Sequence, residues 1–171
     1  MVPNPNDDFE KYKVDDEKCI ELYHQLHFKE AQECFEKNGK NGIMIFTGSR
    51  GPFYRGAVLL ELERYQDAID WFDQALKFEQ SEQILYHKGL ALSHLGKHQD
   101  AIEYLSKALK INPNYLSAMQ EIGLVLDNSG RAPEAIVWYN KALELDPKNV
   151  DIIFELEELD KPDHSGTALS G

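Results

Sequence analysis

Cysteine is scarce in this chain, with two residues among 171. Two thiols cannot form the set of bridges that holds small secreted domains together. Basic residues are also in the minority, with 18 Lys and Arg against 30 Asp and Glu and a formal net charge of −12. Binding to phosphates needs a basic surface, so this balance argues against nucleic acid as a ligand. It mildly favours a basic or apolar partner, because net charge steers association.

Long apolar segments are missing as well. The chain has no run of about 18 apolar residues and no amino-terminal segment that joins basic to apolar residues. We therefore expect neither a membrane span nor a secretory signal. Cys19 and Cys34 are interpreted as buried reduced thiols in preference to a bridge, and a cytoplasmic location is then the default.

What the chain does contain is an internal repeat. Three stretches align at a period of 33 to 34 residues, measured between successive glycines. In each copy the glycine is followed by two alanines at fixed offsets, and the last two copies end on a proline. The matching residues are Gly56, Ala68 and Ala75, then Gly89, Ala101, Ala108 and Pro113, then Gly123, Ala135, Ala142 and Pro147.

Each copy is predicted to fold as two amphipathic helices joined by a tight turn. In the middle copy, apolar residues recur at helical spacing on either side of a break at Gly96. The small residues mark places where helices approach closely, because a larger side chain would push the backbones apart. Pro113 and Pro147 end the second helix, since proline lacks an amide donor and restricts the residue before it. No copy can bury its apolar face alone, so the copies stack into one core.

On these residues the chain resembles the tetratricopeptide repeat (TPR) family, over Phe53 to Asn149. With the glycine counted as position 8 of each copy, the family also favours Leu at position 11 and a large apolar residue at position 24. Those positions hold Leu59 and Phe72, then Leu92 and Leu105, then Leu126 and Tyr139. The resemblance implies an all-α fold, a right-handed α-solenoid of helix-turn-helix units with a carboxyl-terminal capping helix.

A degenerate fourth copy precedes these three. If Ala31 takes position 20, Cys19 falls at position 8 and Phe35 at position 24, while Asn38 replaces the Ala of position 27. We expect this copy to have a short second helix and an irregular connection. The apolar run Ile43 to Phe46 in that connection is expected to pack against the first stack.

The predicted organisation covers the whole chain. It comprises a disordered amino terminus at 1–8, a degenerate TPR-like pair with its connection at 9–48, TPR units at 49–81, 82–115 and 116–149, a capping helix at 150–160 and a disordered tail at 161–171. A cap with a polar outer face is what the exposed end of a repeat array needs. Both ends are acidic, with 6 basic against 10 acidic residues in 1–48 and 1 against 6 in 150–171.

Residues typical of catalysis or metal binding form no motif. His87 and His94 are seven residues apart, about 10.5 Å of helical rise, which is too far to share an ion. Gly48, Gly51 and Gly56 follow no predicted strand, and no Gly-Lys-Ser/Thr follows them, so a phosphate loop is not indicated. We therefore predict no enzyme, no metal and no cofactor.

Aromatic residues also recur at position 23 of the three clear copies, as Trp71, Tyr104 and Trp138. Such a stripe could serve as a ligand platform, but the family often has an aromatic residue there for packing. We favour the packing role.

The resemblance also implies a binding face. In TPR arrays the first helices line a concave groove, and side chains at positions 2, 5, 6, 9, 12 and 13 point into it. Ala57 and Leu60 fall on such positions. The candidate groove residues are Arg50, Phe53, Tyr54, Tyr86, His87, Leu90, His94, Gln120, Glu121, Leu124 and Asn128. One half is aromatic and apolar and the other is polar and acidic, which favours a peptide with an apolar anchor and a basic or amide-rich flank. The alternative is that these side chains pack against their neighbours or against the chain's own amino-terminal segment.

One known TPR ligand does not suit this groove. TPR co-chaperones hold the carboxyl-terminal tails of heat-shock chaperones with a clamp of Lys, Asn and Arg, and those positions here read Phe53, Ala57, His87, Ser117 and Glu121. None matches, and Glu121 would repel a carboxylate.

The resemblance therefore implies a non-enzymatic adaptor or scaffold that binds a peptide segment of a partner protein without a carboxylate clamp. The alternative is a structural repeat protein that self-associates through Ile43 to Phe46 or through the capping helix.

Overall fold

The computed structural model of the protein describes residues 16–39, 48–159 and 161, and its regular elements are helices. The predicted disordered amino terminus, the run Ile43 to Phe46 and all but residue 161 of the predicted tail lie outside the described residues. The helices follow in the order α2 (Glu17–His24), α3 (Phe28–Gly39), α4 (Arg50–Glu61), α5 (Tyr65–Leu76), α6 (Glu82–His94), α7 (His98–Ile111), α8 (Leu116–Asn128), α9 (Ala132–Leu145) and α10 (Val150–Leu159).

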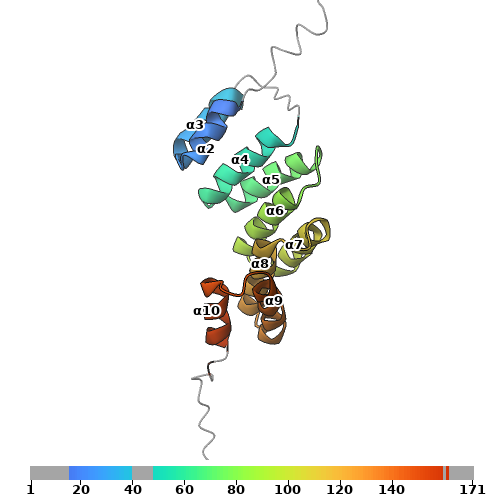
Figure 1. Ribbon diagram of the computed structural model, residues 1–171. Helices are drawn as coiled ribbons and strands as arrows, with labels where there is room; N and C mark the ends of the chain where they lie inside the picture. The colour runs from blue at the N-terminus through green and yellow to red at the C-terminus, as the bar shows by residue number, and fades with distance from the viewer. Residues whose placement is uncertain (1–15, 40–47, 160, 162–171) are drawn as a thin grey trace, which may run out of the picture.

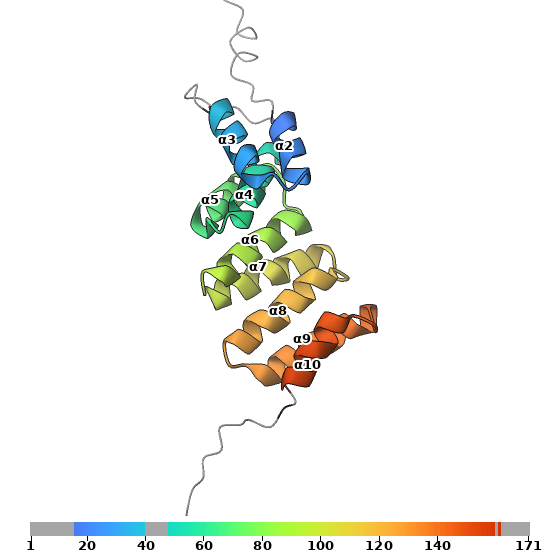
Figure 2. The ribbon, with the colours of Figure 1, turned by 90° about the vertical axis from the view of Figure 1, so that its left-hand side faces the viewer.

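Successive helices pair, and the pairs stack along one axis from α2 to α10 (Figure 1). We call α2, α4, α6, α8 and α10 the first helices, and α3, α5, α7 and α9 the second helices. Seen from the side, the first helices α6, α8 and α10 lie one below another (Figure 2). The molecule is thus an all-α solenoid of helix-turn-helix units that ends in a capping helix.

The turn between the two helices is the same in all four units. Position 15 has a positive φ in each, at Leu26 (62°), Glu63 (59°), Gly96 (70°) and Gly130 (75°). The next amide donates to the carbonyl of the Leu at position 11, at 2.8 to 3.0 Å: His27 to Leu22, Arg64 to Leu59, Lys97 to Leu92 and Arg131 to Leu126. This pattern closes a helix through a left-handed residue, which glycine adopts without strain and other residues adopt at a cost.

The glycine at position 8 touches the large side chain at position 24 of its own unit. A Cβ atom added to Gly56 would lie 2.6 Å from the Phe72 ring, and one added to Gly89 would lie 2.8 Å from Leu105. At Gly123 the Tyr139 ring is closer still. The small residues of the repeat are therefore required by packing, as the spacing predicts.

The structure corrects the expectation of reduced thiols. Cys19 and Cys34 form a disulfide, with their Cα atoms 5.4 Å apart. Cys19 occupies position 8, where the other units have the glycine, and Cys34 occupies position 23, next to the position 24 side chain that the glycine touches in the other units. The expected short second helix is also wrong: α3 has 12 residues, as many as α5, and the shortened helix is α2 with 8.

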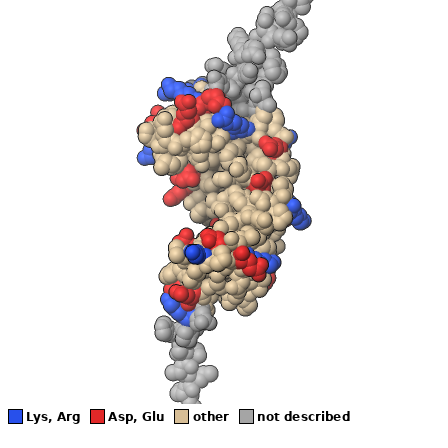
Figure 3. All heavy atoms as spheres, viewed as in Figure 1, with Lys and Arg blue, Asp and Glu red and all other residues tan. Residues whose placement is uncertain are grey.

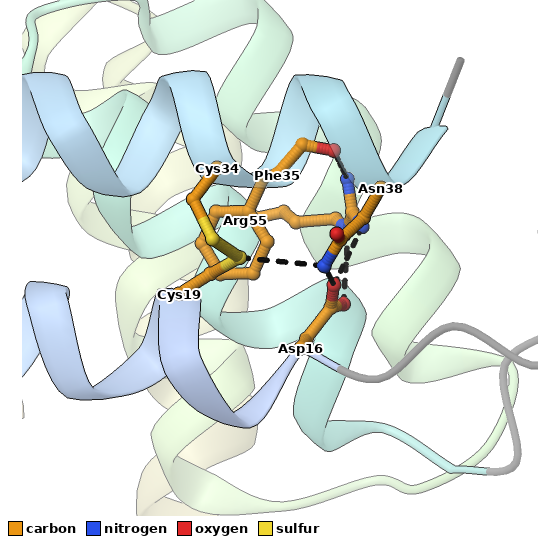
Figure 4. The surroundings of a disulfide bond; sticks show 6 residues. All are labelled: Asp16, Cys19, Cys34, Phe35, Asn38 and Arg55. Atoms are coloured by element: carbon orange, nitrogen blue, oxygen red, sulfur yellow. Dashed lines mark hydrogen bonds and ion pairs between the residues drawn. A yellow bond between two sulfur atoms is a disulfide. The ribbon is translucent and has the colours of Figure 1, made fainter.

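This disulfide-linked pair, α2 and α3, docks on α4 through a buried arginine (Figure 4). Both side chains of the Asp16–Arg55 ion pair are 5% exposed, and their N and O atoms are 2.8 Å apart. Arg55 also donates to the Phe35 carbonyl at 2.9 Å, and Asn38 donates to Asp16 at 3.0 Å. A buried pair is strongly destabilising when one partner is removed, so these contacts fix how the first unit sits on the array.

The carboxyl-terminal end is closed by α10, whose Ile152 is fully buried. Val150 and Phe154 of the same helix remain 73% and 57% exposed. No helix of residues 16–39 or 48–159 has both the length and the apolar character that crossing a bilayer requires.

Candidate functional site

The first helices line one side of the solenoid, and the molecule is hollowed on that side. Figure 3 shows the hollow between the end formed by α2 and α3 and the end formed by α10, with acidic side chains at its rim. Direct packing of α2 on α4, α4 on α6 and α6 on α8 makes its floor continuous. Elongated ligands suit such a surface better than small molecules do, since it is open along its length.

Seven rings contact one another in sequence from α2 through α4 and α6 to the residue before α8, and we call them the aromatic track. They belong to Tyr23, His24, Tyr54, Phe53, His87, Tyr86 and Tyr115. Each successive pair has centroids 5.0 to 5.5 Å apart, and the rings meet edge to face or tilted. None of the seven residues is buried, so their surfaces are available to a ligand.

The predicted site residues of the first two clear units are therefore brought together. Phe53 and Tyr54 of α4 meet His87 and Tyr86 of α6 through the contact of the Phe53 and His87 rings at 5.0 Å. His87 is fixed by its Nδ1 atom, which lies 2.7 Å from the Gln83 carbonyl. Burial lowers the pKa of His87, so the neutral ring that packs on Phe53 is favoured near neutral pH.

A half-buried carboxylate lies near the carboxyl-terminal end of α6. Glu121 of α8 interacts with Ser93 and His94 of α6, and burial raises the pKa of Glu121 above its ordinary value. Burial, and then the nearby Glu121, raise the pKa of Tyr86 to about 12. A cationic group brought to this place would lower the cost of ionising Glu121, whereas an anion would increase it.

The remaining candidates are spread around these residues. Leu90, Gln120 and Leu124 are half-buried, and Asn128 is exposed. His94 is exposed and stacks on Tyr65 of α5, with centroids 4.7 Å apart.

Some residues that were assigned to groove positions lie elsewhere in the structure. Arg50 is exposed and pairs with Glu17 at 2.6 Å, so it joins two units at the edge. Ala57 and Leu60 are 1% and 8% exposed, so both belong to the core and not to the ligand surface.

The sequence-based site missed three rings of the track. Tyr23 and His24 fall at positions 12 and 13 of the degenerate copy, which are groove positions, and Tyr115 precedes α8. Tyr23 and His24 would have been identified if the groove positions had also been assigned in the degenerate copy. Tyr115 lies outside the repeat's groove positions, and only its contact with Tyr86 at 5.2 Å reveals it.

Cations at position 7 were missed as well. The Arg55 guanidinium lies 5.2 Å from the Trp71 ring centroid, and the Lys88 ammonium lies 4.1 Å from that of Tyr104. Lys88 also donates to Asp73 and to the Tyr104 hydroxyl. Burial alone would lower the pKa of Lys88, but these hydrogen bonds raise it. In these two units the position 23 aromatics cover a buried cation, which supports packing over a ligand platform.

The described residues also line two pockets. One of about 320 Å³ separates α3 from α5 and is lined by Phe35, Arg55 and Trp71 among others. The other, of about 210 Å³, is lined by Arg50, Phe53, Tyr54 and Gln83 among others and continues the track at its edge. No group of three His, Cys, Asp or Glu side chains in the described part of the chain is arranged to hold a metal ion.

Family models match the chain at three places. Residues 52–83 and 83–115 each match a model described as tetratricopeptide repeat, and residues 123–156 match one described as TPR repeat. The comparison with curated proteins gives no match.

Solved structures share the fold. YrrB, described as a TPR protein with an unusual peptide-binding site, is 18% identical with a TM-score of 0.72, over 80% of this chain and 69% of its own. MamA from Desulfovibrio magneticus RS-1 is 21% identical with a TM-score of 0.68, over 78% and 75%. The TPR domain of Arabidopsis OM64 is 20% identical with a TM-score of 0.63, over 66% and 93%.

Proposed function

The chain belongs to the tetratricopeptide repeat family, and on that premise we propose that it is a non-enzymatic adaptor that binds a peptide segment of a partner protein in its concave groove. The observation that carries the proposal is the aromatic track, a line of half-buried and exposed rings that connects the first helices α2, α4 and α6. Tyrosine and other aromatic side chains give large contact areas at low entropic cost and dominate many interfaces.

The charges near the track define the polarity of the ligand. Glu121 is half-buried, and burial raises its pKa, so its ionised form is poorly compensated in the free protein. A ligand with a basic or amide-rich flank supplies that compensation, whereas a terminal carboxylate adds repulsion. This supports a groove that works without a carboxylate clamp.

Partner capture from the source cell tests the proposal. The variant combines Tyr86→Ala with Leu90→Glu, which removes one ring of the track and places a charge on the half-buried floor. We expect partner capture to be lost while the helical circular-dichroism signal persists.

A matched control carries the same chemistry on the opposite side. Ile136→Glu with Val137→Ala alters two apolar residues of α9 that are 36% and 52% exposed. Capture should survive in this control. If the groove variant still captured the partner, or if both variants lost capture equally, binding of the partner in the groove would be contradicted.

Self-association is the second candidate function, and the exposed Val150 and Phe154 of α10 favour it. The same helix carries Glu155, Glu157 and Glu158, so two copies meeting through α10 would bring like charges together. Light scattering over a concentration series decides between a monomer and an assembly. The other proposed contact, Ile43 to Phe46, lies outside the described residues.

The redox state of the two cysteines bears on the cellular compartment of the protein. A cytoplasmic location was predicted from reduced thiols, and the Cys19–Cys34 disulfide weighs against it, because disulfides persist mainly in oxidising compartments. Alkylation of the protein in its source cell before reduction measures the state of both thiols. Unlabelled cysteines would favour an oxidising compartment, and labelled ones would favour the cytoplasm.

A further inference from the structure

The repeat brings position 12 of one unit against position 6 of the next, across neighbouring first helices. Between α2 and α4 these positions hold Tyr23 and Tyr54, whose ring centroids are 5.3 Å apart. Between α6 and α8 they hold Ser93 and Glu121, which form a hydrogen bond. Both are groove positions, so the residue types found there decide what each boundary between units offers to a ligand.

The last first helix, α10, keeps this register. Position 3 is buried in α6, α8 and α10 alike, as Ile84, Ala118 and Ile152. The position 12 and position 6 residues between α8 and α10 are therefore Asp127 and Glu155, both half-buried. Two carboxylates thus replace the ring contact or hydrogen bond of the earlier boundaries. No Lys or Arg within residues 16–39, 48–159 or 161 forms an ion pair with either of them.

A buried hydroxyl group lies at the same boundary. Tyr139 is fully buried, and its hydroxyl has no hydrogen-bond partner among the residues that the structure describes. Its ring packs on α8 at Gly123, where an added Cβ atom would lie 2.9 Å from the ring carbon that carries the hydroxyl. Asp127 is one helical turn further along that face of α8. Burial raises the pKa of Tyr139, and the nearby Glu155 and then Asp127 raise it further, so the hydroxyl lies close to both carboxylates.

This hydroxyl occurs only where the two carboxylates occur. Position 24 holds Phe35, Phe72 and Leu105 in the other three units, and none of these side chains has a polar atom. A buried hydroxyl without a partner is rare in a folded protein and calls for an explanation. Here it adjoins two carboxylates that can only accept hydrogen bonds when ionised, so the missing group is a donor with positive charge.

We propose that Asp127, Glu155 and the Tyr139 hydroxyl bind an Arg side chain of the partner peptide between α8 and α10. The inference rests on the proposed function and assigns one subsite at the carboxyl-terminal end of the groove. A guanidinium group carries five N–H donors in one plane, so it can donate to two carboxylates and a hydroxyl oxygen at once. Glu121 takes no part, because it is bonded to Ser93 at the preceding boundary.

Nuclear magnetic resonance titration of the full chain with small capped amino acids tests the inference. The probe is acetyl-arginine-N-methylamide, and the amide signals of α8 and α10 are followed. Capped citrulline, which has the same shape without the charge, and capped lysine serve as comparisons. The arginine probe should shift the amides of Asp127 and Glu155 saturably, capped lysine should bind more weakly, and capped citrulline should not bind.

Two variants with a matched control locate the binding. Asp127→Asn with Glu155→Gln should abolish the saturable shifts. Asp151→Asn with Glu157→Gln removes the same charges from exposed residues of α10 and should change the affinity by less than about twofold, because exposed charges are screened.

The second variant, Tyr139→Phe, removes only the hydroxyl. It should weaken the arginine probe about tenfold, the loss expected for one hydrogen bond to a charged group. The melting temperature should not fall, since the hydroxyl has no partner in the described part of the free protein.

The outcomes separate this inference from the proposed function. Equal binding of capped arginine and citrulline, equal loss in the two double variants, or an unchanged affinity of Tyr139→Phe would overturn the subsite. Calcium chloride that shifts the same amides at a lower concentration than the arginine probe would also overturn it and assign the place to a metal ion. Loss of partner capture by the Tyr86 and Leu90 variant would in each of these cases still support the groove.

Discussion

Removal of the disulfide is expected to loosen one end of the solenoid and leave the rest folded. The change is Cys19→Ser with Cys34→Ser, which avoids leaving a single thiol. The bridge closes a loop with a sequence separation of 15. Loop-closure entropy for about 15 residues corresponds to about 3 kcal/mol of stabilisation.

The loss should be confined to α2 and α3. Apart from the bridge, this pair is held by the Asp16–Arg55 ion pair, the Arg55 bond to the Phe35 carbonyl and a small apolar cluster that includes Val58. It packs less extensively on α4 than α5 packs on α6. Since each unit of a solenoid is stabilised only by its neighbours, α7 and α8 should not respond.

Hydrogen exchange followed by mass spectrometry measures this locally. A loss of about 3 kcal/mol should speed exchange in α2 and α3 about 100-fold, with no change in α7 and α8. Dithiothreitol should reproduce the effect in the natural protein and do nothing to the variant. Equal acceleration throughout the chain, or none in α2 and α3, would refute the reasoning.

Three further predictions concern the repeat and the groove. Gly123→Ala should lower the free energy of unfolding by about 1–3 kcal/mol in urea denaturation, because the added Cβ meets the Tyr139 ring, whereas Gly48→Ala has open space and should be near neutral; equal effects would contradict the packing role. Glu63→Gly should raise the melting temperature, gaining about 0.5–1 kcal/mol, because a non-glycine residue at φ 59° is strained by more than glycine costs in the unfolded chain; a lower melting temperature would contradict it. His87 has a lowered pKa in the folded state, so below about pH 6.5 the unfolded chain binds a proton that the folded chain does not. The free energy of unfolding therefore decreases as the pH is lowered. His87→Gln should therefore flatten the dependence of the urea midpoint on pH between about 7.5 and 5.5, and an unchanged slope would be evidence against a shifted His87.

The solenoid was predictable because its packing constraints act at fixed sequence offsets. Gly56 must be small since Phe72 lies against it, and the same contact recurs 33 residues later between Gly89 and Leu105. The turn between the two helices could be predicted from the sequence in only some of the units. Gly96 indicates it, whereas Glu63 takes the same left-handed conformation with a side chain that rarely adopts it.

The disulfide shows where composition misled the prediction. Two cysteines suggested reduced thiols, but the repeat register already placed Cys19 at position 8 and Cys34 at position 23, on facing sides of the helix pair. The register was a better guide than the cysteine count.

The candidate groove was predictable as a set of positions and not as a set of contacts. Positions 5 and 6 identify Phe53, Tyr54, Tyr86 and His87, but the meeting of the Phe53 and His87 rings depends on how α4 and α6 cross. The roles of Arg55 and Lys88 were missed because a cation in a helix is expected to be solvent-exposed until its aromatic partner is seen.

Site-specific photo-crosslinking tests the central claim, that the concave groove binds a partner peptide, most directly. Benzoylphenylalanine replaces Asn128, an exposed candidate groove residue of α8, or Val137, an exposed residue of the second helix α9. Irradiated in an extract of the source cell, the Asn128 derivative should give a cross-linked partner that an excess of unlabelled protein displaces, and the Val137 derivative should give none. Cross-links from Val137 alone, or from both positions equally, would contradict a partner held in the groove.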